Sequence, residues 1–210
     1  MLCFMHMKAS NLVKLTGFLF EIGNLRKVLR AHQQMLLSYD LTDTIASHSF
    51  RVAIIGYFLA KEVGANADTV LKMCLLHDIE ESRSADHNWV SKKYVKIFTE
   101  EIMHDQFAGL PHSAELMMVL KEYEERQTLE SKVAKDADLL DQIFLLREYD
   151  WQGNREAGGW LGGKDKKGEF SRTSNQEKLM HTKFAKELAG EVKKQAPSDW
   201  WSKSWTPKRR

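Results

Sequence analysis

Four residues of this chain have the types and the spacing of a metal site: His48, the adjacent pair His77 and Asp78, and Asp138. Imidazole nitrogens and carboxylate oxygens together suit a divalent ion such as Mn, Co, Fe, Mg or Zn. The His-Asp pair stands at the end of an apolar run, where two hydrophilic residues are otherwise hard to explain. With a coordination position left for water, such a site hydrolyses phosphoesters. These residues therefore indicate a metal-dependent phosphohydrolase.

The elements that must position these residues are helices, because apolar residues recur at helical spacing and no segment alternates strictly as a half-buried strand does. His48 shares an inward stripe with Val52, Ile55 and Leu59, and Gly64 is well placed to end their helix. The sequence predicts an all-α, single-domain helical bundle with a central buried metal site. The predicted helices span about residues 11–30, 43–63, 67–80, 90–104, 113–126, 129–149 and 174–195.

The two neighbours His77 and Asp78 would project about 100° apart on an ideal helix, so both reach one ion only near a helix end or with the ion between them. All four candidate ligands fall on helices predicted to share one core, where unpaired charge is costly and a metal offsets the cost. Two simpler interpretations stay open. His48 can be a hydrogen-bonded core histidine, and Asp138 can be a helix-face carboxylate paired with Lys135.

Composition and the flanking segments narrow the class of protein. A formal net charge of +2 over 210 residues lacks the basic excess that is typical of a nucleic-acid-binding groove, so we expect no nucleic-acid partner. No stretch reaches the roughly 18–20 apolar residues of a membrane span, and the start is a poor signal peptide, so we expect a cytoplasmic protein. Cys3 and Cys74 are expected to be free thiols.

One domain is expected, flanked by two less ordered segments. Residues 1–10 are expected to be a mobile N-terminus, 11–195 the helical domain and 196–210 a C-terminal tail. Inside the domain, the glycine-rich stretch 153–168 is predicted to be a flexible loop or a lid. After it, Ser174 and Glu177 have the spacing of a capping box that opens the last helix.

The order of the four candidate ligands resembles the H…HD…D signature of the HD-domain phosphohydrolase superfamily. Residues 77–86, which include Glu81 and Asp86, resemble the HDxxExxxxD motif of its 5′-deoxynucleotidase-like branch. Residues 135–140 resemble the second acidic motif of that branch. The resemblance extends over about residues 25–149, which is most of the expected core.

The resemblance implies roles for residues around the ion, with His48, His77, Asp78 and Asp138 as its ligands. Glu81 would be the general acid/base or a neighbour of a second ion, and Asp86 would hold the substrate sugar or assist that ion. Arg30 matches an arginine that orients the phosphate. The chain departs from the branch at Ala31, where a tryptophan is common, and at Ser47, where a glutamate is common.

The resemblance predicts a metal-dependent 5′-nucleotidase that releases phosphate from (deoxy)ribonucleoside 5′-monophosphates, and it is compatible with a homodimer. One alternative is an HD-type hydrolase of another phosphoester, such as a dNTP, an alarmone or a cyclic nucleotide. Another is a non-catalytic metal-binding module. Individual residues also have simpler interpretations: Glu81 as part of a solvated helix end, Asp86 as a loop or cap residue, and Arg30 as a surface residue.

Overall fold

A computed structural model describes residues 9–162 and 174–202 of the chain. Most of the predicted mobile N-terminus, including Cys3, lies outside the described residues. So do the second half of the predicted glycine-rich loop and the end of the C-terminal tail.

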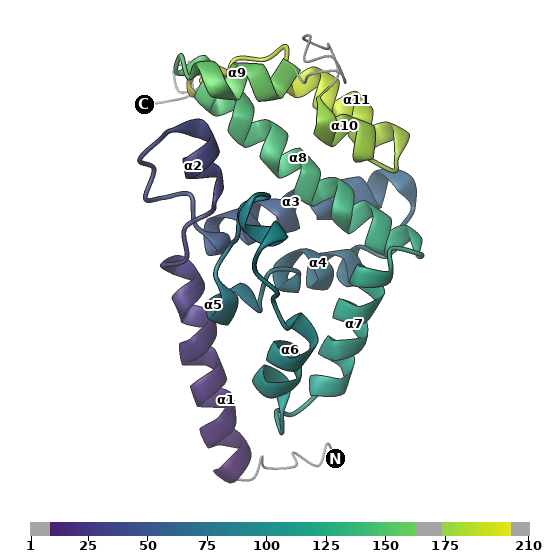
Figure 1. Cartoon of the computed structure of the whole chain (residues 1–210). Coiled ribbons are helices and arrows are strands. Elements are labelled where there is room, and N and C mark those ends of the chain that lie inside the picture. Colours follow the sequence, from purple (N-terminus) through teal and green to yellow (C-terminus); the bar gives the residue numbers. More distant parts are fainter. Residues whose placement is uncertain (1–8, 163–173, 203–210) are drawn as a thin grey trace, which may run out of the picture.

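The described residues fold into a helical bundle, as predicted, and their only β-type pairing is an isolated bridge between Leu29 and Thr44. In Figure 1 the long helix α8 runs diagonally across α3 and α4, with α9, α10 and α11 above it in the view and α6 and α7 below. The helices are α1 (Ala9–Ile22), η1 (Gly23–Arg26), α2 (His32–Leu36), α3 (Ile45–Val63), α4 (Ala67–Leu76), α5 (Glu81–Ser84), η2 (Ser91–Lys93), α6 (Thr99–Phe107), α7 (Ser113–Glu125), α8 (Leu129–Trp151), α9 (Arg155–Gly162), α10 (Asn175–Leu179), α11 (Lys183–Val192) and α12 (Asp199–Ser202).

Helices α3, α4 and α8 form the centre of the core, and a glycine lets the first two approach closely. A Cβ atom added at Gly56 would lie 2.6 Å from Cys74 Sγ and 3.0 Å from a Val70 methyl carbon, both on α4. Because a Cβ atom less than 3.0 Å from another heavy atom is essentially never found, a larger residue would require Cys74 or the two helices to shift. Cys74 is a buried free thiol, as predicted.

Side-chain caps fix where these helices begin and end. The Thr44 hydroxyl accepts from the Ser47 backbone N–H, and Ser47 returns a bond to the Thr44 backbone, so α3 starts with a capping box. Gly64, in the left-handed conformation at φ 76°, ends α3 as predicted. Asn66 then caps α4, and Ser174 opens α10 with the predicted capping box.

Four predicted helix boundaries are wrong. The first helix ends at Ile22, and the predicted helix over 90–104 is a short 3-10 turn followed by α6 at Thr99. The third helix ends at Leu76 rather than Glu80. The last helix is two helices, α10 and α11, because the Asp136 carboxylate accepts hydrogen bonds from the chain between them.

The prediction of a loop over the glycine-rich stretch is also wrong in its first half, which forms α9. Ala157 and Leu161 are one helical turn apart and buried in the core, and the Asn154 side chain accepts from the Ala157 N–H at 3.0 Å. Burial of two apolar residues on one face outweighs the low helix propensity of the glycines.

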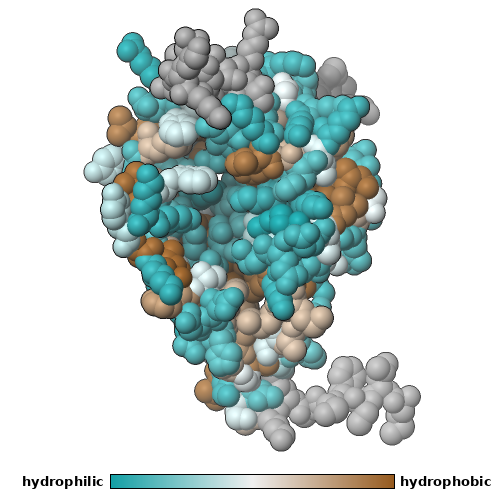
Figure 2. All heavy atoms as spheres, turned by 45° about the vertical axis from the view of Figure 1, so that its right-hand side comes forward, coloured by the Kyte–Doolittle hydropathy of each residue, from teal (hydrophilic) through white to brown (hydrophobic). Residues whose placement is uncertain are grey.

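No helix among the described residues is long and apolar enough to cross a bilayer. Figure 2 shows a mostly hydrophilic face, with apolar side chains in separate patches and a hollow near its centre.

Candidate metal centre

Helix α3 places His48 in its first turn, on the face that is turned into the bundle. The capping box fixes the start of the helix, and the His48 side chain is fully buried. In the 5′-deoxynucleotidase-like branch that the sequence resembles, glutamate is common at the position of Ser47. In this chain Ser47 caps the helix instead. The local sequence therefore holds His48 rigidly and turns it towards α4 and α8.

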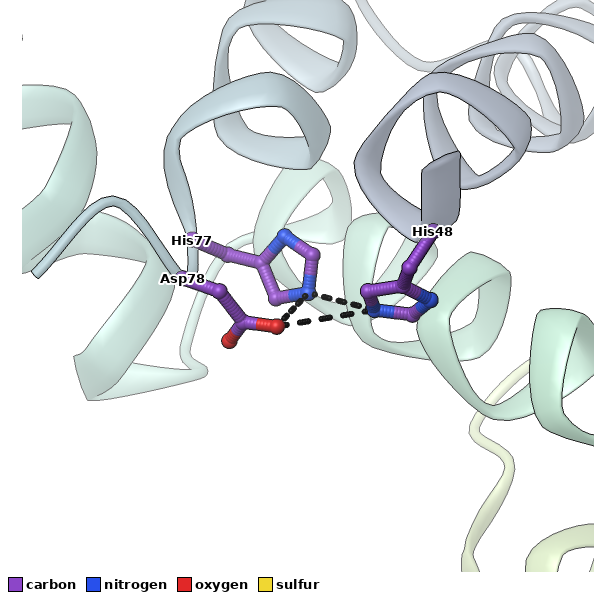
Figure 3. Close-up of side chains that lie close together, drawn as sticks. All are labelled: His48, His77 and Asp78. Atoms are coloured by element: carbon purple, nitrogen blue, oxygen red, sulfur yellow. Dashed lines mark hydrogen bonds and ion pairs between the residues drawn. The ribbon is translucent and has the colours of Figure 1, made fainter. Parts of the chain in front are cut away.

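His77 and Asp78 lie where α4 ends, as the geometry of adjacent ligands requires. His77 is the C-terminal cap of α4, and its N–H still bonds the Met73 carbonyl at 2.9 Å. Asp78 follows in the turn that leads to α5. Because the chain leaves the helix at this point, both side chains turn towards His48 (Figure 3).

The ligand atoms of these three residues converge. The two Nε2 atoms of His48 and His77 are 3.2 Å apart, and Asp78 Oδ2 lies 3.5 Å from the first and 3.2 Å from the second. Figure 3 shows the three side chains pointing at one common position from two facing helices. The sequence-predicted group is therefore brought together.

Asp138 on α8 joins the group at a slightly greater distance. Its Oδ1 atom lies 3.4 Å from His48 Nε2 and 3.9 Å from His77 Nε2. Its other oxygen accepts from Lys135 Nζ at 2.6 Å. One oxygen of Asp138 therefore faces the cluster, and the other is paired with Lys135.

Hydrogen bonds behind the two histidines orient their rings. His77 Nδ1 lies 2.9 Å from the Cys74 carbonyl, and His48 Nδ1 lies 2.6 Å from Asp141 Oδ2. A carbonyl and an ionised carboxylate only accept, so both Nδ1 atoms carry the proton. In the neutral rings both Nε2 lone pairs then face the cluster, as in metal sites where a carboxylate or carbonyl orients a ligating histidine.

The electrostatics of the cluster favour a cation. Burial alone would lower the pKa of His77, but Asp78 and Asp138 outweigh it and raise that pKa to about 9. Burial opposes ionisation of Asp78, yet His77 and His48 hold its pKa well below the usual range. The carboxylates therefore stay ionised, and a positive charge between the ligands is stabilised.

The donor set and its spacing fit a divalent ion. Ligand atoms about 2.0–2.2 Å from such an ion lie roughly 3.0–3.5 Å from one another. Most of the separations in the cluster, from 3.2 to 3.5 Å, are in that range. Two imidazole lone pairs facing each other at 3.2 Å repel unless a proton or a metal lies between them. His48, His77, Asp78 and Asp138 can therefore hold one ion.

The remaining predicted residues surround this cluster. Glu81 opens α5, and its Oε2 atom is buried without a hydrogen-bond partner among the described residues. Burial, reinforced by the charges of Asp78 and Asp86, raises the pKa of Glu81 to about 9. Arg30 is buried rather than at the surface, and its Nη1 donates to Asp141 at 3.2 Å. Asp86 accepts from the backbone N–H of Ala31 at 2.8 Å.

Sequence reasoning did not identify Asp141, which lies behind His48. Besides that histidine it binds Arg30 and Arg51, whose guanidinium also donates to Glu148 at 2.6 Å. Burial opposes its ionisation, but His48 and the two arginines lower the pKa of Asp141 to about 2. Its position one turn after Asp138 on the same helix was an available signal.

Comparison with known proteins places this site in a family. The model of the HD domain family matches residues 22–187. The 5′-deoxynucleotidase HDDC2 of Dictyostelium discoideum is 28% identical over 145 residues, which cover 63% of this chain and 76% of the relative.

Two solved structures share the fold at lower identity. A conserved hypothetical protein from Pyrococcus furiosus is 23% identical with a TM-score of 0.66, covering 86% of this chain and 99% of that one. A "predicted metal-dependent phosphohydrolase" from Magnetospirillum magnetotacticum is 22% identical with a TM-score of 0.62, covering 87% and 91% of the two chains. At these identities the likeness is one of fold.

Proposed function

This chain belongs to the HD domain family and is a metal-dependent phosphohydrolase, and we propose that it is a 5′-nucleotidase that releases phosphate from nucleoside 5′-monophosphates, preferably deoxyribonucleotides. One observation carries the proposal: two imidazoles and two carboxylates converge beside Glu81, a buried acid whose Oε2 has no partner among the described residues. The resemblance to a 5′-deoxynucleotidase supports the same substrate class.

We assign His48, His77, Asp78 and Asp138 as the ligands of the ion, which can be Mn, Co, Fe, Mg or Zn. When bound, the ion supplies Lewis-acid activation of water and of the phosphoryl group. The hydrogen bonds from the two Nδ1 atoms to Cys74 and Asp141 keep the ring orientation fixed during the reaction.

Glu81 is assigned to proton transfer. Its raised pKa leaves the carboxyl protonated at neutral pH in the metal-free protein, so it is suited to donate a proton to the leaving 5′-oxygen. Once ionised, the same carboxylate can accept a proton from the attacking water. Its buried, unpartnered oxygen indicates that no group of the described chain competes for this role.

Arg30 and Asp86 are assigned to the substrate. Arg30 is held by Asp141 through Nη1, which leaves the rest of its planar guanidinium to balance charge on the phosphate. Asp86 binds the chain at Ala31, directly after Arg30, and we propose that its second oxygen is available to the substrate sugar. Positioning of the phosphate then depends on both residues.

The test is phosphate release from a panel of nucleoside mono-, di- and triphosphates in the presence of added Mn or Co. We expect release from deoxyribonucleoside 5′-monophosphates and loss of that activity in Asp78→Ala. Asp105→Ala is the matched control, because Asp105 is an exposed carboxylate on α6 and its loss should leave activity unchanged. A metal-loaded protein inert to every monophosphate would refute the proposal.

A further inference from the structure

A short strap of chain, residues 28–32, passes the metal centre and is fixed on two sides. On one side, Leu29 forms a backbone bridge with Thr44, and the Arg30 N–H donates to the Asp43 carbonyl at 3.0 Å. On the other side, the Asp86 carboxylate accepts from Ala31. The side chains of the strap are therefore held next to the cluster.

His32, the last residue of the strap, has a defined tautomer and one free ring nitrogen. The Gln142 amide nitrogen donates to His32 Nε2 at 2.8 Å, so the proton of the neutral ring is on Nδ1. That Nδ1 atom is buried and has no hydrogen-bond partner among the described residues. Burial, with the charge of Arg30, lowers the pKa of His32 to about 3, so the ring is neutral at physiological pH.

Arg30 has a second free donor in the same strap. Its Nε is buried and unpartnered, although Nη1 binds Asp141. Leaving a buried donor without an acceptor costs free energy, so two of them within three residues indicate that an acceptor arrives with a ligand. The acceptor belongs near the metal centre, because Gln142 lies one helical turn after Asp138 on α8.

We propose that His32 is a substrate-binding residue, whose Nδ1–H and the Nε–H of Arg30 together bind oxygens of the phosphoryl group. This inference rests on the proposed function, because it takes the phosphate to be the group that the site binds. A phosphate offers several acceptor oxygens and negative charge, which suits one cationic and one neutral donor. Both atoms are closed to solvent, so phosphate reaches them only when neighbouring side chains move.

Two substitutions distinguish the contributions of the two ring nitrogens of His32 to binding. The side-chain amide of Asn reaches the position of Nδ1, whereas that of Gln reaches the position of Nε2. We expect His32→Asn to bind inorganic phosphate almost as the wild type does. In His32→Gln and His32→Ala we expect binding to be about ten- to one-hundredfold weaker, as for loss of a hydrogen bond to a charged group. Isothermal titration calorimetry of the metal-loaded protein with inorganic phosphate measures this.

Thermal unfolding of the phosphate-free protein distinguishes binding from a structural role. Because Nδ1 has no partner before the ligand arrives and Gln keeps the bond with Gln142, we expect the melting temperature of His32→Gln to stay close to that of the wild type. His32→Asn loses the bond with Gln142, so we expect it to melt slightly lower but still to bind phosphate. His104→Gln is the control, because His104 is an exposed histidine on α6. It should change neither the melting temperature nor phosphate binding.

Three results would overturn the inference: equal phosphate binding by all three His32 variants and the wild type, equal loss in Asn and Gln, or no phosphate binding by the wild type. Weaker binding that follows a lowered melting temperature would assign His32 a structural role instead. The proposed function fails separately. If monophosphates are not hydrolysed but phosphate binding still depends on Nδ1 of His32, the binding site stands and the substrate assignment does not.

Discussion

Two carboxylates on α8, only two residues apart, have opposite surroundings. Asp136 is fully buried, and its oxygens accept from the His181 N–H at 2.7 Å and from the N–H and hydroxyl of Thr182 at 2.8 and 2.7 Å. Asp138 has Lys135 on one oxygen and only imidazole Nε2 atoms beside the other. Asp138 is only partly buried, and only Asp136 is saturated with donors.

The difference teaches how to separate structure from function at a buried charge. Asp136 is satisfied by the chain, so its role is to hold α11 against α8 and to end α10. Asp138 and Asp78 face histidine nitrogens whose other ring atoms are already used, so this cluster needs a cation to be satisfied. Unsatisfied groups mark the site better than burial does.

The largest effect is expected on activity at the unsatisfied carboxylate. Asp138→Ala removes a proposed ligand, and we expect phosphate release to fall by more than about 1000-fold, as when a metal that activates water is lost. The measurement is kcat with saturating metal. Activity within tenfold of the wild type would contradict the assignment of Asp138.

At the saturated carboxylate, Asp136, we expect the main effect on stability rather than on activity. Asp136→Ala leaves two backbone N–H groups and one hydroxyl without their acceptor, and we expect the free energy of unfolding to fall by about 3–5 kcal/mol. Urea denaturation of the metal-free protein measures this. The same assay on Asp138→Ala should give a smaller loss, and equal losses would remove the distinction between the two residues.

Asp141 tests whether orientation of a ligand matters as much as the ligand. Asp141→Asn keeps the shape but removes the charge that binds His48, Arg30 and Arg51. We expect metal affinity to fall about 10- to 100-fold, as for other groups behind a ligating histidine. Competition with a chelator measures the affinity. Unchanged affinity would show that His48 is oriented without it.

The smallest predicted effect concerns the pH dependence of stability at Glu81. Its pKa is about 9 in the folded protein but near 4.5 when unfolded, so rising pH deprotonates the unfolded chain first and destabilises the fold. Glu81→Gln removes this dependence. At pH 8 we expect the metal-free variant to be about 1–3 kcal/mol more stable than the wild type, and at pH 4 to be equal to it. If the stabilities of the wild type and of Glu81→Gln changed in parallel between pH 4 and pH 8, Glu81 would not be a buried acid with a raised pKa.

The sequence was sufficient for the fold class and for most central helices, because the apolar stripes around His48 and Asp138 are long and regular. It also predicted that His77 and Asp78 need a helix end, which the structure has at Leu76. These features depend on local spacing, which a sequence displays directly.

What the sequence did not reveal depends on contacts between distant residues. The break between α10 and α11 is made by Asp136, 45 residues before His181. The contacts of Asp141 with His48 and of Gln142 with His32 exist only because α3 and the strap lie beside α8 in the fold. Helix α9 was missed because its glycines conceal two buried apolar residues. The predicted domain boundaries, the homodimer and the roles of the site residues stay predictions.

The close contact of α3 and α4 at Gly56 has a consequence for the choice of ion. Gly56 is eight residues after His48, about 12 Å along the helix, and Cys74 is three residues before His77. The lack of a side chain at Gly56 therefore allows α3 and α4 to lie close together beside the two helix ends that carry the histidines. If Gly56→Ala separates the two helices, we expect the distance between the histidines to grow and larger ions with longer ligand bonds to be favoured. Packing of the helices away from the ligands would then influence which ion this site prefers.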